Sequence, residues 1–326
     1  MRKAALLYNP DSGGSRKRRE SELQSVLAIL SDANVDATLV FTKSRAHAEE
    51  KARQAVLAGC DTIFACGGDG TIHNVIQVLA HTQVALAILP MGTANALAHD
   101  LCLPMNIAGA ATSLLRAVPR RVSLGQIQYQ DFHGAPCTRY FVMAAGAGVD
   151  AALFHALTPG TKQRLGMAAY YAKAWHLWFS YAMPRFQIEY TAADSEHEGS
   201  PSPRRALITE MLAVRIRNFG GALQHLAPGA SLDRSDVRLI LCRTASRLAY
   251  LAYVARSLLR LNWTVPGIDL VHVSQASCDY APHGNKPQQE IYVEADGELL
   301  GTLPARITMV PDALTVLSPE VGTSTK

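Results

Sequence analysis

The sequence predicts two domains, an α/β domain followed by a domain composed mostly of β-strands. Up to about residue 122, short apolar runs alternate with helical patterns, which is typical of a Rossmann-like parallel sheet covered by helices on both faces. From residue 123 to about 305, alternating apolar and polar runs separated by turn residues predict antiparallel strands, which we interpret as a β-sandwich. We expect residues from about 306 to 326 to return to the first domain. A chain of 326 residues, 48% of them hydrophobic, can fill two cores.

The elements follow in a regular order. In the first domain we expect strands over 3–8, 37–41, 62–65 and 84–89, and helices over 16–30 and 45–57 and after each of the last two strands. In the second we expect strands over 122–129, 138–145, 186–190, 210–217, 237–241, 270–273 and 290–295. Helices over 162–183 and 245–261 interrupt these strands, and the polar stretch 192–205 is expected to be a surface loop. Two final strands, 306–310 and 315–317, complete the chain.

The stretch 66–74, Cys-Gly-Gly-Asp-Gly-Thr-Ile-His-Asn, lies between a predicted buried strand and a predicted helix. Its three glycines, Gly67, Gly68 and Gly70, let the backbone turn sharply and leave no Cβ in the way of a phosphate. The helix start adds N–H groups and a positive dipole end. Asp69 would repel phosphate unless a metal ion or a proton transfer uses it, so the loop suggests phosphoryl transfer. A glycine-rich turn that merely carries an aspartate is the structural alternative.

Two further loops of this kind follow predicted strands. Residues 90–95 read Pro-Met-Gly-Thr-Ala-Asn, and residues 9–15 read Asn-Pro-Asp-Ser-Gly-Gly-Ser. In an open parallel sheet, the loops at the carboxyl ends of the strands line one crevice, where ligands bind. The three loops together therefore predict a nucleotide site, although no Walker sequence is present.

These loops resemble the diacylglycerol kinase catalytic family of lipid kinases, which includes bacterial diacylglycerol kinases and the sphingosine and ceramide kinases. The resemblance continues in the order of the family through Gly146–Asp150, Asn218-Phe219-Gly220-Gly221, Ala227-Pro228-Gly229-Ala230 and Asp296-Gly297-Glu298. It implies a two-domain enzyme of lipid metabolism and phospholipid biosynthesis that uses ATP and Mg²⁺. The γ-phosphate would be transferred to a lipid hydroxyl in the cleft between the domains.

The resemblance also assigns roles to single residues. Asp69, Asp296 and Glu298 would form the catalytic acid cluster, with Asp69 also tied to the Mg²⁺ of the nucleotide. Asp150 would contact the lipid headgroup. The expected ATP-binding residues are Asn9, Gly13, Thr42, Gly67, Gly68, Asp69, Gly70, Thr71, Gly92, Thr93 and Asn95. Which of the three carboxylates accepts the proton stays open.

The sequence departs from the family pattern at three places. Ala96 replaces an Asp found after the loop 90–95 in many bacterial diacylglycerol kinases, and Ser123 replaces an Asp at the start of the second domain. Arg234-Ser235 stands where the family has an Asp-Gly pair that supports a structural Mg²⁺. Since a guanidinium cannot bind Mg²⁺, we expect that site to be absent or shifted. Ala96 and Asp150 slightly favour a sphingoid or ceramide-like lipid over diacylglycerol. An NAD kinase-like enzyme and a lipid-binding protein with weakened catalysis remain alternatives.

The amino-acid composition further restricts the class of protein and its expected partners. A net charge of +4 is too small to favour a nucleic-acid partner. The six cysteines show no CxxC spacing, which indicates reduced core residues of a cytoplasmic protein. No signal peptide and no transmembrane segment are predicted. We therefore expect a soluble enzyme that meets its lipid at the inner membrane surface, in a peripheral and transient way, with a homodimer possible. The basic run 16–19 indicates a solvated helix face or a contact with anionic lipids.

Overall fold

The computed structural model describes residues 1–10, 16–156, 176, 178–193, 203–219, 225–281 and 289–319. The chain divides into two compact units. The first comprises Met1–Leu124, Asn218–Gly221 and Val310–Lys326, and the second comprises Gly125–Arg217 and Ala222–Met309. Strands β5 (Val118–Gln130) and β14 (Glu298–Ser318) each run from one unit into the other.

The first unit contains a parallel sheet in the strand order β2-β1-β3-β4-β14. Its strands are β1 (Lys3–Tyr8), β2 (Asp36–Phe41), β3 (Thr62–Gly67), β4 (Ala85–Pro90) and the end of β14. Every residue of β3 and β4 is buried, as expected for central strands covered on both faces. The edge strand β2 has no fully buried residue. This is the predicted nucleotide-domain architecture.

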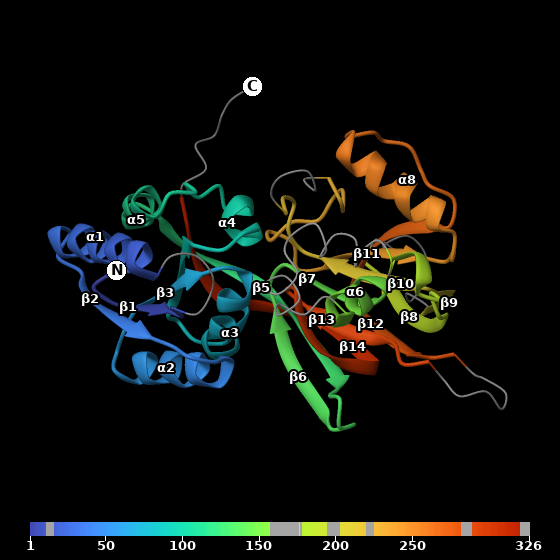
Figure 1. The fold of residues 1–326 in the computed structure, drawn as a ribbon, viewed down its shortest axis with the longest axis horizontal. Helices are drawn as coiled ribbons and strands as arrows, with labels where there is room; N and C mark the ends of the chain where they lie inside the picture. The colour runs from blue at the N-terminus through green and yellow to red at the C-terminus, as the bar shows by residue number, and fades with distance from the viewer. Residues whose placement is uncertain are drawn as a thin grey trace. The chain divides into compact units, whose positions relative to one another are not determined.

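Helices cover both faces of this sheet (Figure 1). They are α1 (Arg16–Asp32), α2 (Arg45–Leu57), α3 (Asp69–Leu79), α4 (Ala96–Asp100) and α5 (Ile107–Leu115). Helices α2 and α3 pack together on one face, and α1 packs with α5 on the other. Side-chain caps fix two of the starts, since Ser44 accepts a hydrogen bond from the N–H of His47 and Asn106 from that of Gly109.

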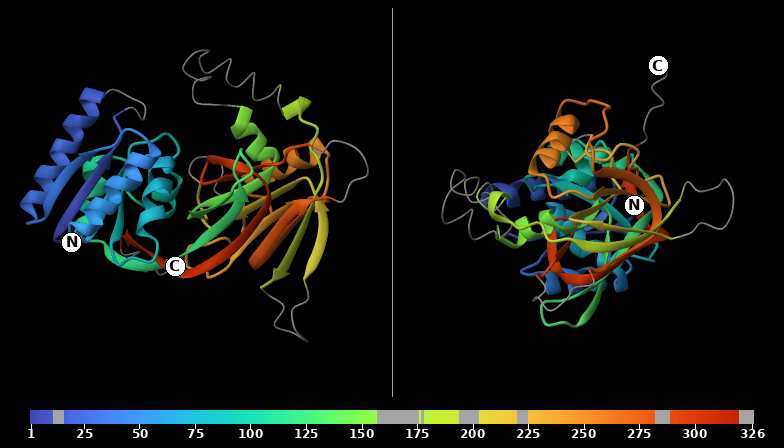
Figure 2. Two further views of the ribbon diagram at one scale, coloured as in Figure 1. Left: turned by 90° about the horizontal axis from the view of Figure 1, so that it is seen from below. Right: turned by 90° about the vertical axis from the view of Figure 1, so that its right-hand side faces the viewer.

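The strands of the second unit that the structure describes pair with one another in the antiparallel direction. Its remaining elements are β6 (Pro136–Phe141), β7 (Ala144–Gly148), α6 (Val149–Ala156), β8 (Phe186–Ala192), β9 (Arg204–Ile208), β10 (Glu210–Val214), β11 (Val237–Cys242), α8 (Arg247–Leu258), β12 (Ile268–Tyr280) and β13 (Tyr292–Ala295). Strand β14 pairs with β13 and further along with β12, so the sheet folds back on itself into two layers (Figure 2).

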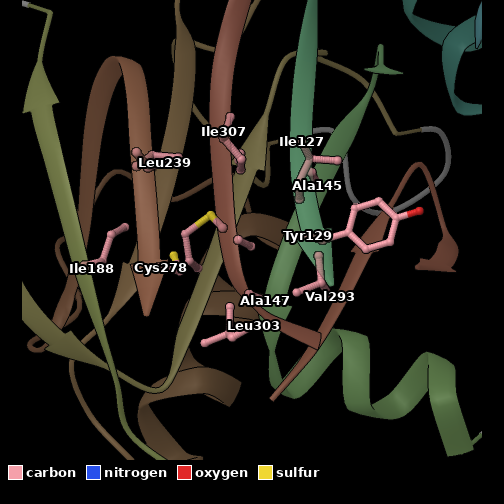
Figure 3. Close-up of a cluster of buried hydrophobic side chains, with 14 of the residues drawn as sticks. Ile127, Tyr129, Ala145, Ala147, Ile188, Leu239, Cys278, Val293, Leu303 and Ile307 are labelled. Carbon is pink, nitrogen blue, oxygen red and sulfur yellow. The ribbon is translucent and has the colours of Figure 1, made fainter. Parts of the chain in front are cut away.

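Apolar side chains from both layers fill the space between the strands. Ile127 of β5, Ala145 of β7, Leu239 of β11 and Ile307 of β14 meet in this core (Figure 3). It is composed mainly of small and branched residues, which suits closely packed strands. This is the sandwich that the alternating pattern predicts.

Several predicted elements need correction. The strand expected over 138–145 is two strands, β6 and β7, because the chain bends at Val142 and Met143. Strand β9 lies partly inside the stretch expected to be a loop, and α6 was not predicted. Most of the helix expected over 162–183 lies outside the described residues. Among the residues that the structure describes, no helix is long and apolar enough to cross a membrane.

Candidate nucleotide and substrate sites

The loops that follow β3 and β4 touch each other through glycine backbones. A Cβ on Gly92 would lie 2.4 Å from the Cα of Gly68, and a Cβ on Gly68 would lie 3.1 Å from the Cα of Gly92. The N–H of Met91 also donates to the carbonyl of Gly67 at 3.0 Å. Only residues without a side chain fit this contact, so the two loops form one continuous backbone surface.

Asp69 joins the two loops a second time. Its Oδ1 accepts a hydrogen bond of 2.9 Å from the N–H of Ala96, the first residue of α4. Asn95 precedes it with φ of 50°, and its side-chain amide bonds both backbone groups of Gly92, at 2.8 and 3.0 Å. The local geometry therefore assigns Asp69 a structural contact, and any catalytic use of its charge would be additional.

Helix α3 starts at this backbone surface with its N-terminus uncapped by a side chain. Gly68 is its N-cap and supplies no side-chain hydrogen bond, while Asp69 and Gly70 form the first turn. The first N–H groups of a helix and its positive dipole end favour an anion. Thr71 packs against Gly67, since a Cβ there would come within 2.2 Å of the Thr71 hydroxyl oxygen. These features are those of a phosphate site.

A cavity of about 630 Å³ opens beside the second loop. Its wall includes Gly92, Asn95, Met105 and the charged side chains Arg18 and Arg19. The volume falls in the range of small-molecule sites, roughly 300–1,000 Å³. Arg18 also pairs with Glu22 at 3.0 Å. The two arginines are pocket residues that the sequence interpretation assigned to a solvated face or to lipid contacts. Their position just after the glycine-rich turn 9–15 is the feature of the sequence that could have indicated this place in the pocket.

The other expected ATP-binding residues are spread around the loops. Thr42 is buried after β2 and donates its N–H to the carbonyl of Tyr8 at 2.8 Å. Thr93 is exposed and Asn9 is half-buried. Gly13 lies outside the described residues. Of the expected set, Gly92 and Asn95 line the cavity, and the ATP-binding role of every member remains a prediction.

In the second unit, Asp296 is fixed by the backbone. Its carboxylate accepts hydrogen bonds from the N–H groups of Val142, Met143 and Ala144, at 3.1, 2.8 and 3.1 Å. Val142 and Met143 form the bend between β6 and β7, and the Asp296 carboxylate supplies acceptors for their N–H groups where the predicted strand breaks. Three backbone donors hold this carboxylate in place, so the geometry gives Asp296 a positioning contact.

Asp296 and Gly297 also form the two-residue turn between β13 and β14. Both have positive φ, 50° and 81°, and Ala295 pairs with Glu298 across the turn. This is the hairpin geometry typical of an Asp-Gly pair. Glu298 is half-buried at the start of β14. The Asp-Gly pair thus forms a hairpin turn and also supplies the Asp296 carboxylate that accepts the three backbone hydrogen bonds.

Asp150, the predicted lipid contact, begins α6 beside a buried glutamate. Its side chain hydrogen-bonds that of Glu210, whose Oε2 also accepts the N–H of Val149. Burial raises the pKa of Asp150, and burial together with the charge of Asp150 raises the pKa of Glu210 well above its usual range. Glu294 is a third buried carboxyl nearby, and burial, followed by the charge of Asp150, raises its pKa well above its usual range. Burial and the proximity of the two carboxyls thus both favour a protonated carboxyl in this pair.

The region of Arg234 contains ion pairs in place of a metal site. Arg234 forms two contacts with Asp236, at 2.6 and 2.5 Å, and Arg217 contacts Asp233 at 2.8 Å. Burial alone would raise the pKa of Asp236, but Arg234 and His272 hold it below its usual range. Both aspartates are thus neutralised by guanidinium groups, and the residues present do not fit a structural Mg²⁺. In the part of the chain that the structure describes, no group of three possible ligands surrounds a metal position.

Comparison with known proteins agrees with this geometry. The sequence profile of the diacylglycerol kinase catalytic domain matches residues 3–127, and that of the YegS C-terminal NAD kinase beta sandwich-like domain matches residues 143–318. The chain belongs to the diacylglycerol kinase catalytic-domain family. The catalytic-domain profile matches the part of the chain that contains the glycine loops. The sandwich-domain profile matches the part that contains Asp150 and Asp296.

Individual members of the family align over almost the whole chain. A diacylglycerol kinase of Bacillus subtilis is 27% identical over 98% of this chain and 97% of its own length. One from Staphylococcus aureus is 26% identical, with coverages of 98% and 93%.

Solved structures show the same fold. A diacylglycerol kinase structure from Bacillus anthracis superposes with a TM-score of 0.68 at 18% identity, covering 98% of this chain and 97% of that one. A yeast NADH kinase complexed with NADH has a TM-score of 0.53 at 10% identity, covering 98% and 84%. These structures show the two-domain fold that the sequence predicts, and the family profile and the curated relatives support a lipid kinase.

Proposed function

We propose that this protein is an ATP-dependent lipid kinase that transfers the γ-phosphate of ATP to a lipid hydroxyl. The contact of Gly68 with Gly92, beside the uncapped start of α3, is the observation that carries this proposal. It joins two loops into one surface of backbone groups next to a cavity of nucleotide size. Arg18, Arg19 and Glu22 all lie on the cavity wall, and with Glu22 paired to Arg18 the wall keeps a net positive charge where a triphosphate would lie.

Catalysis would depend on positioning and on compensation of charge. The lipid hydroxyl oxygen would bond to the γ-phosphorus, the bond to the bridging oxygen of ADP would break, and the hydroxyl proton would pass to a carboxylate. In-line phosphoryl transfers of this kind need little covalent help from the protein. Mg²⁺ would enter with the nucleotide as part of the substrate, offsetting the repulsion between its phosphates and Asp69.

The three predicted catalytic carboxylates would then have different tasks. Asp296, held by three backbone N–H groups, would keep the bend between β6 and β7 in shape. Asp69 or Glu298 would take the proton.

The acceptor lipid would contact the second unit near Asp150. A cavity of about 260 Å³ is lined there by Ala152 and Leu153 of α6 together with Tyr181. Burial raises the pKa of both Asp150 and Glu210, so this pair would carry less negative charge than two separate exposed carboxylates. Neutral diacylglycerol would make no ion pair with it, whereas the ammonium group of a sphingoid base could pair with a single ionised carboxyl.

One assay tests the proposal against its rivals. Purified protein would be given ATP labelled at the γ-phosphate, with Mg²⁺ and, in separate reactions, diacylglycerol, sphingosine, ceramide and NAD. We expect label in a lipid and none in NAD, and Asp150→Ala to change kcat/KM by different factors for sphingosine and diacylglycerol. Label in NAD alone would identify an NAD kinase-like enzyme. No transfer to any acceptor, with lipid still bound, would identify a binding protein that has lost catalysis.

A further inference from the structure

Helix α8 and the residues after it present apolar side chains to solvent. Leu248 is 77% exposed, Leu259 is 66% exposed and Trp263 is 54% exposed. We call this set the α8 surface; it consists of Leu248, Leu251, Val254, Leu258, Leu259, Leu261 and Trp263. Almost half of the large exposed hydrophobic residues in the described part of the chain fall in these sixteen positions. Contiguous exposure of this kind marks an interaction site.

The orientation of the helix is fixed by its opposite face. Tyr250 and Tyr253 are buried, and their hydroxyl groups bond the Thr209 hydroxyl at 2.8 Å and the Leu226 carbonyl at 2.6 Å. Leu248, Leu251 and Leu258 recur at helical spacing on the outer side. An ordinary surface helix turns its leucines inward and its polar groups outward. Here the leucines lie outside, where α8, coloured orange, stands at the outer side of its unit (Figures 1 and 2).

The charge around the α8 surface is positive. The segment 243–264 contains four arginines and no acidic residue. Arg243 pairs with Asp269 at 2.8 Å, and Arg256 lies over the ring of Tyr253, while Arg260 is exposed at the end of the helix. Exposed leucines and a tryptophan, in a segment whose charged residues are all arginines, are the composition of a helix that lies in the interface of an anionic bilayer.

The start of α8 is also joined to the predicted acceptor site. Arg247 donates hydrogen bonds to the carbonyls of Trp178 and Tyr181, at 3.1 and 2.8 Å. Tyr181 lines the small cavity beside α6, the helix that carries Asp150. A membrane at the α8 surface would thus lie next to the place where an acceptor lipid is expected.

We propose that the α8 surface docks the protein on anionic membranes by inserting its leucines and Trp263 into the interfacial layer. The proposal rests on the proposed lipid-kinase function for its choice of partner. It locates membrane contact on the second unit, in addition to any contact through the basic run 16–19 of α1.

The test compares two double variants in binding to vesicles of phosphatidylglycerol and phosphatidylcholine. Leu248→Glu with Leu259→Glu changes the α8 surface, and Leu57→Glu with Leu207→Glu makes the same change at two other exposed leucines. We expect the first variant to lose at least about tenfold in vesicle affinity and the second to keep the wild-type affinity within about twofold. Wild-type binding should weaken as salt rises. Both variants should phosphorylate a monomeric short-chain diacylglycerol like the wild type.

A second measurement does not depend on those variants folding. The difference in fluorescence between wild type and Trp263→Phe isolates Trp263, and vesicles should shift its emission to the blue and expose it to quenching by brominated lipids. Unchanged Trp263 emission at saturating vesicles would overturn the proposal. A dimer in ultracentrifugation that only the α8 variant dissociates, with vesicle binding intact, would also overturn it and assign the surface to a second copy. Docking through α8 without phosphate transfer to any lipid would support docking and refute the kinase proposal.

Discussion

In the first unit the candidate site is made of backbone, whereas in the second it is made of paired side chains. Gly68 and Gly92 are in contact because neither has a side chain, and Asp69 bonds a backbone N–H. In the second unit, Asp150 is paired with Glu210 and Asp236 with Arg234. A site made of backbone N–H groups recognises phosphate itself, and the glycines that form it tolerate substitution poorly. A site of paired side chains can change its charge from one relative to another, which is where acceptor choice and metal use can diverge.

The largest effect is expected from Asp69→Asn. The amide keeps an oxygen that can accept the N–H of Ala96, so the contact between the loops should survive. The change removes the charge and the ability to take a proton, and kcat should fall at least about a hundredfold, as for loss of a general base. Steady-state kinetics with ATP and lipid would measure it, with Asp36→Asn, at an exposed position of β2, as the control.

The melting temperature of Asp69→Asn should stay near that of the wild type. A variant that keeps more than about a tenth of kcat, a barrier change below roughly 1.4 kcal/mol, would show that Asp69 serves only as a cap of α4.

The backbone site is probed next by graded glycine substitutions. Gly92→Ala would place a Cβ 2.4 Å from the Cα of Gly68, whereas Gly68→Ala would place one 3.1 Å from the Cα of Gly92. Because backbone atoms cannot move aside as a flexible side chain can, Gly92→Ala should destabilise the protein by about 1–3 kcal/mol. It should also raise the KM for ATP. Gly68→Ala should destabilise the protein less and raise the KM for ATP less. Denaturant unfolding and ATP titration would measure the two variants. Equal, negligible effects would mean that the loops do not act as one surface.

The contrast also explains what could be predicted from the sequence. Strands β1, β3 and β4 are short apolar runs followed by glycine-rich turns, so their order and their shared edge follow from local patterns. The contacts of Asp296 with the bend at Val142 and Met143 join residues more than 150 positions apart. No local pattern contains such a pairing, and the predicted strand over 138–145 therefore ran through the bend.

The candidate site divides in the same way. The glycines and Asp69 were visible as a motif, and so was the place of Asp150. Glu210 looked like an ordinary strand residue, because its burial depends on β7 and α6 covering it. The pairing that sets the charge of Asp150 was thus outside the reach of the sequence.

A smaller effect should follow from Glu210→Gln, which tests the paired side chains. An unfolded glutamate releases its proton near pH 4.3, whereas the raised pKa of Glu210 keeps the proton in the folded state at higher pH. Between these values the folded state binds more protons than the unfolded state, so wild-type stability falls as pH rises. The amide side chain of the variant does not titrate in this range, and the slope should become less steep.

Denaturant unfolding at pH 5 and pH 8 would measure the slope. We expect Glu210→Gln to gain about 1 kcal/mol relative to wild type between the two values, since one unit of pKa shift corresponds to roughly 1.4 kcal/mol. Asp150 and Glu294, whose pKa values are also raised, should leave part of the slope in place. Glu50→Gln, on the exposed side of α2, is the matched control and should keep the wild-type slope. If the two variants behave alike, Glu210 is not protonated in the folded state.

The smallest effect is expected from magnesium alone. Arg234 and Arg217 already neutralise Asp236 and Asp233, so Mg²⁺ would have to displace two guanidinium groups to bind there. A ligand that binds the folded state stabilises it in proportion to the logarithm of its concentration over Kd, and a site that does not bind gives no shift. Millimolar Mg²⁺ without nucleotide should therefore change Tm by less than about 1 °C, whereas Mg²⁺ with ATP should raise it. A rise of several degrees with Mg²⁺ alone, abolished by Asp233→Asn or Asp236→Asn, would show that a structural metal site exists despite Arg234. The second unit would then contain a metal site in addition to the paired side chains that distinguish it from the first unit.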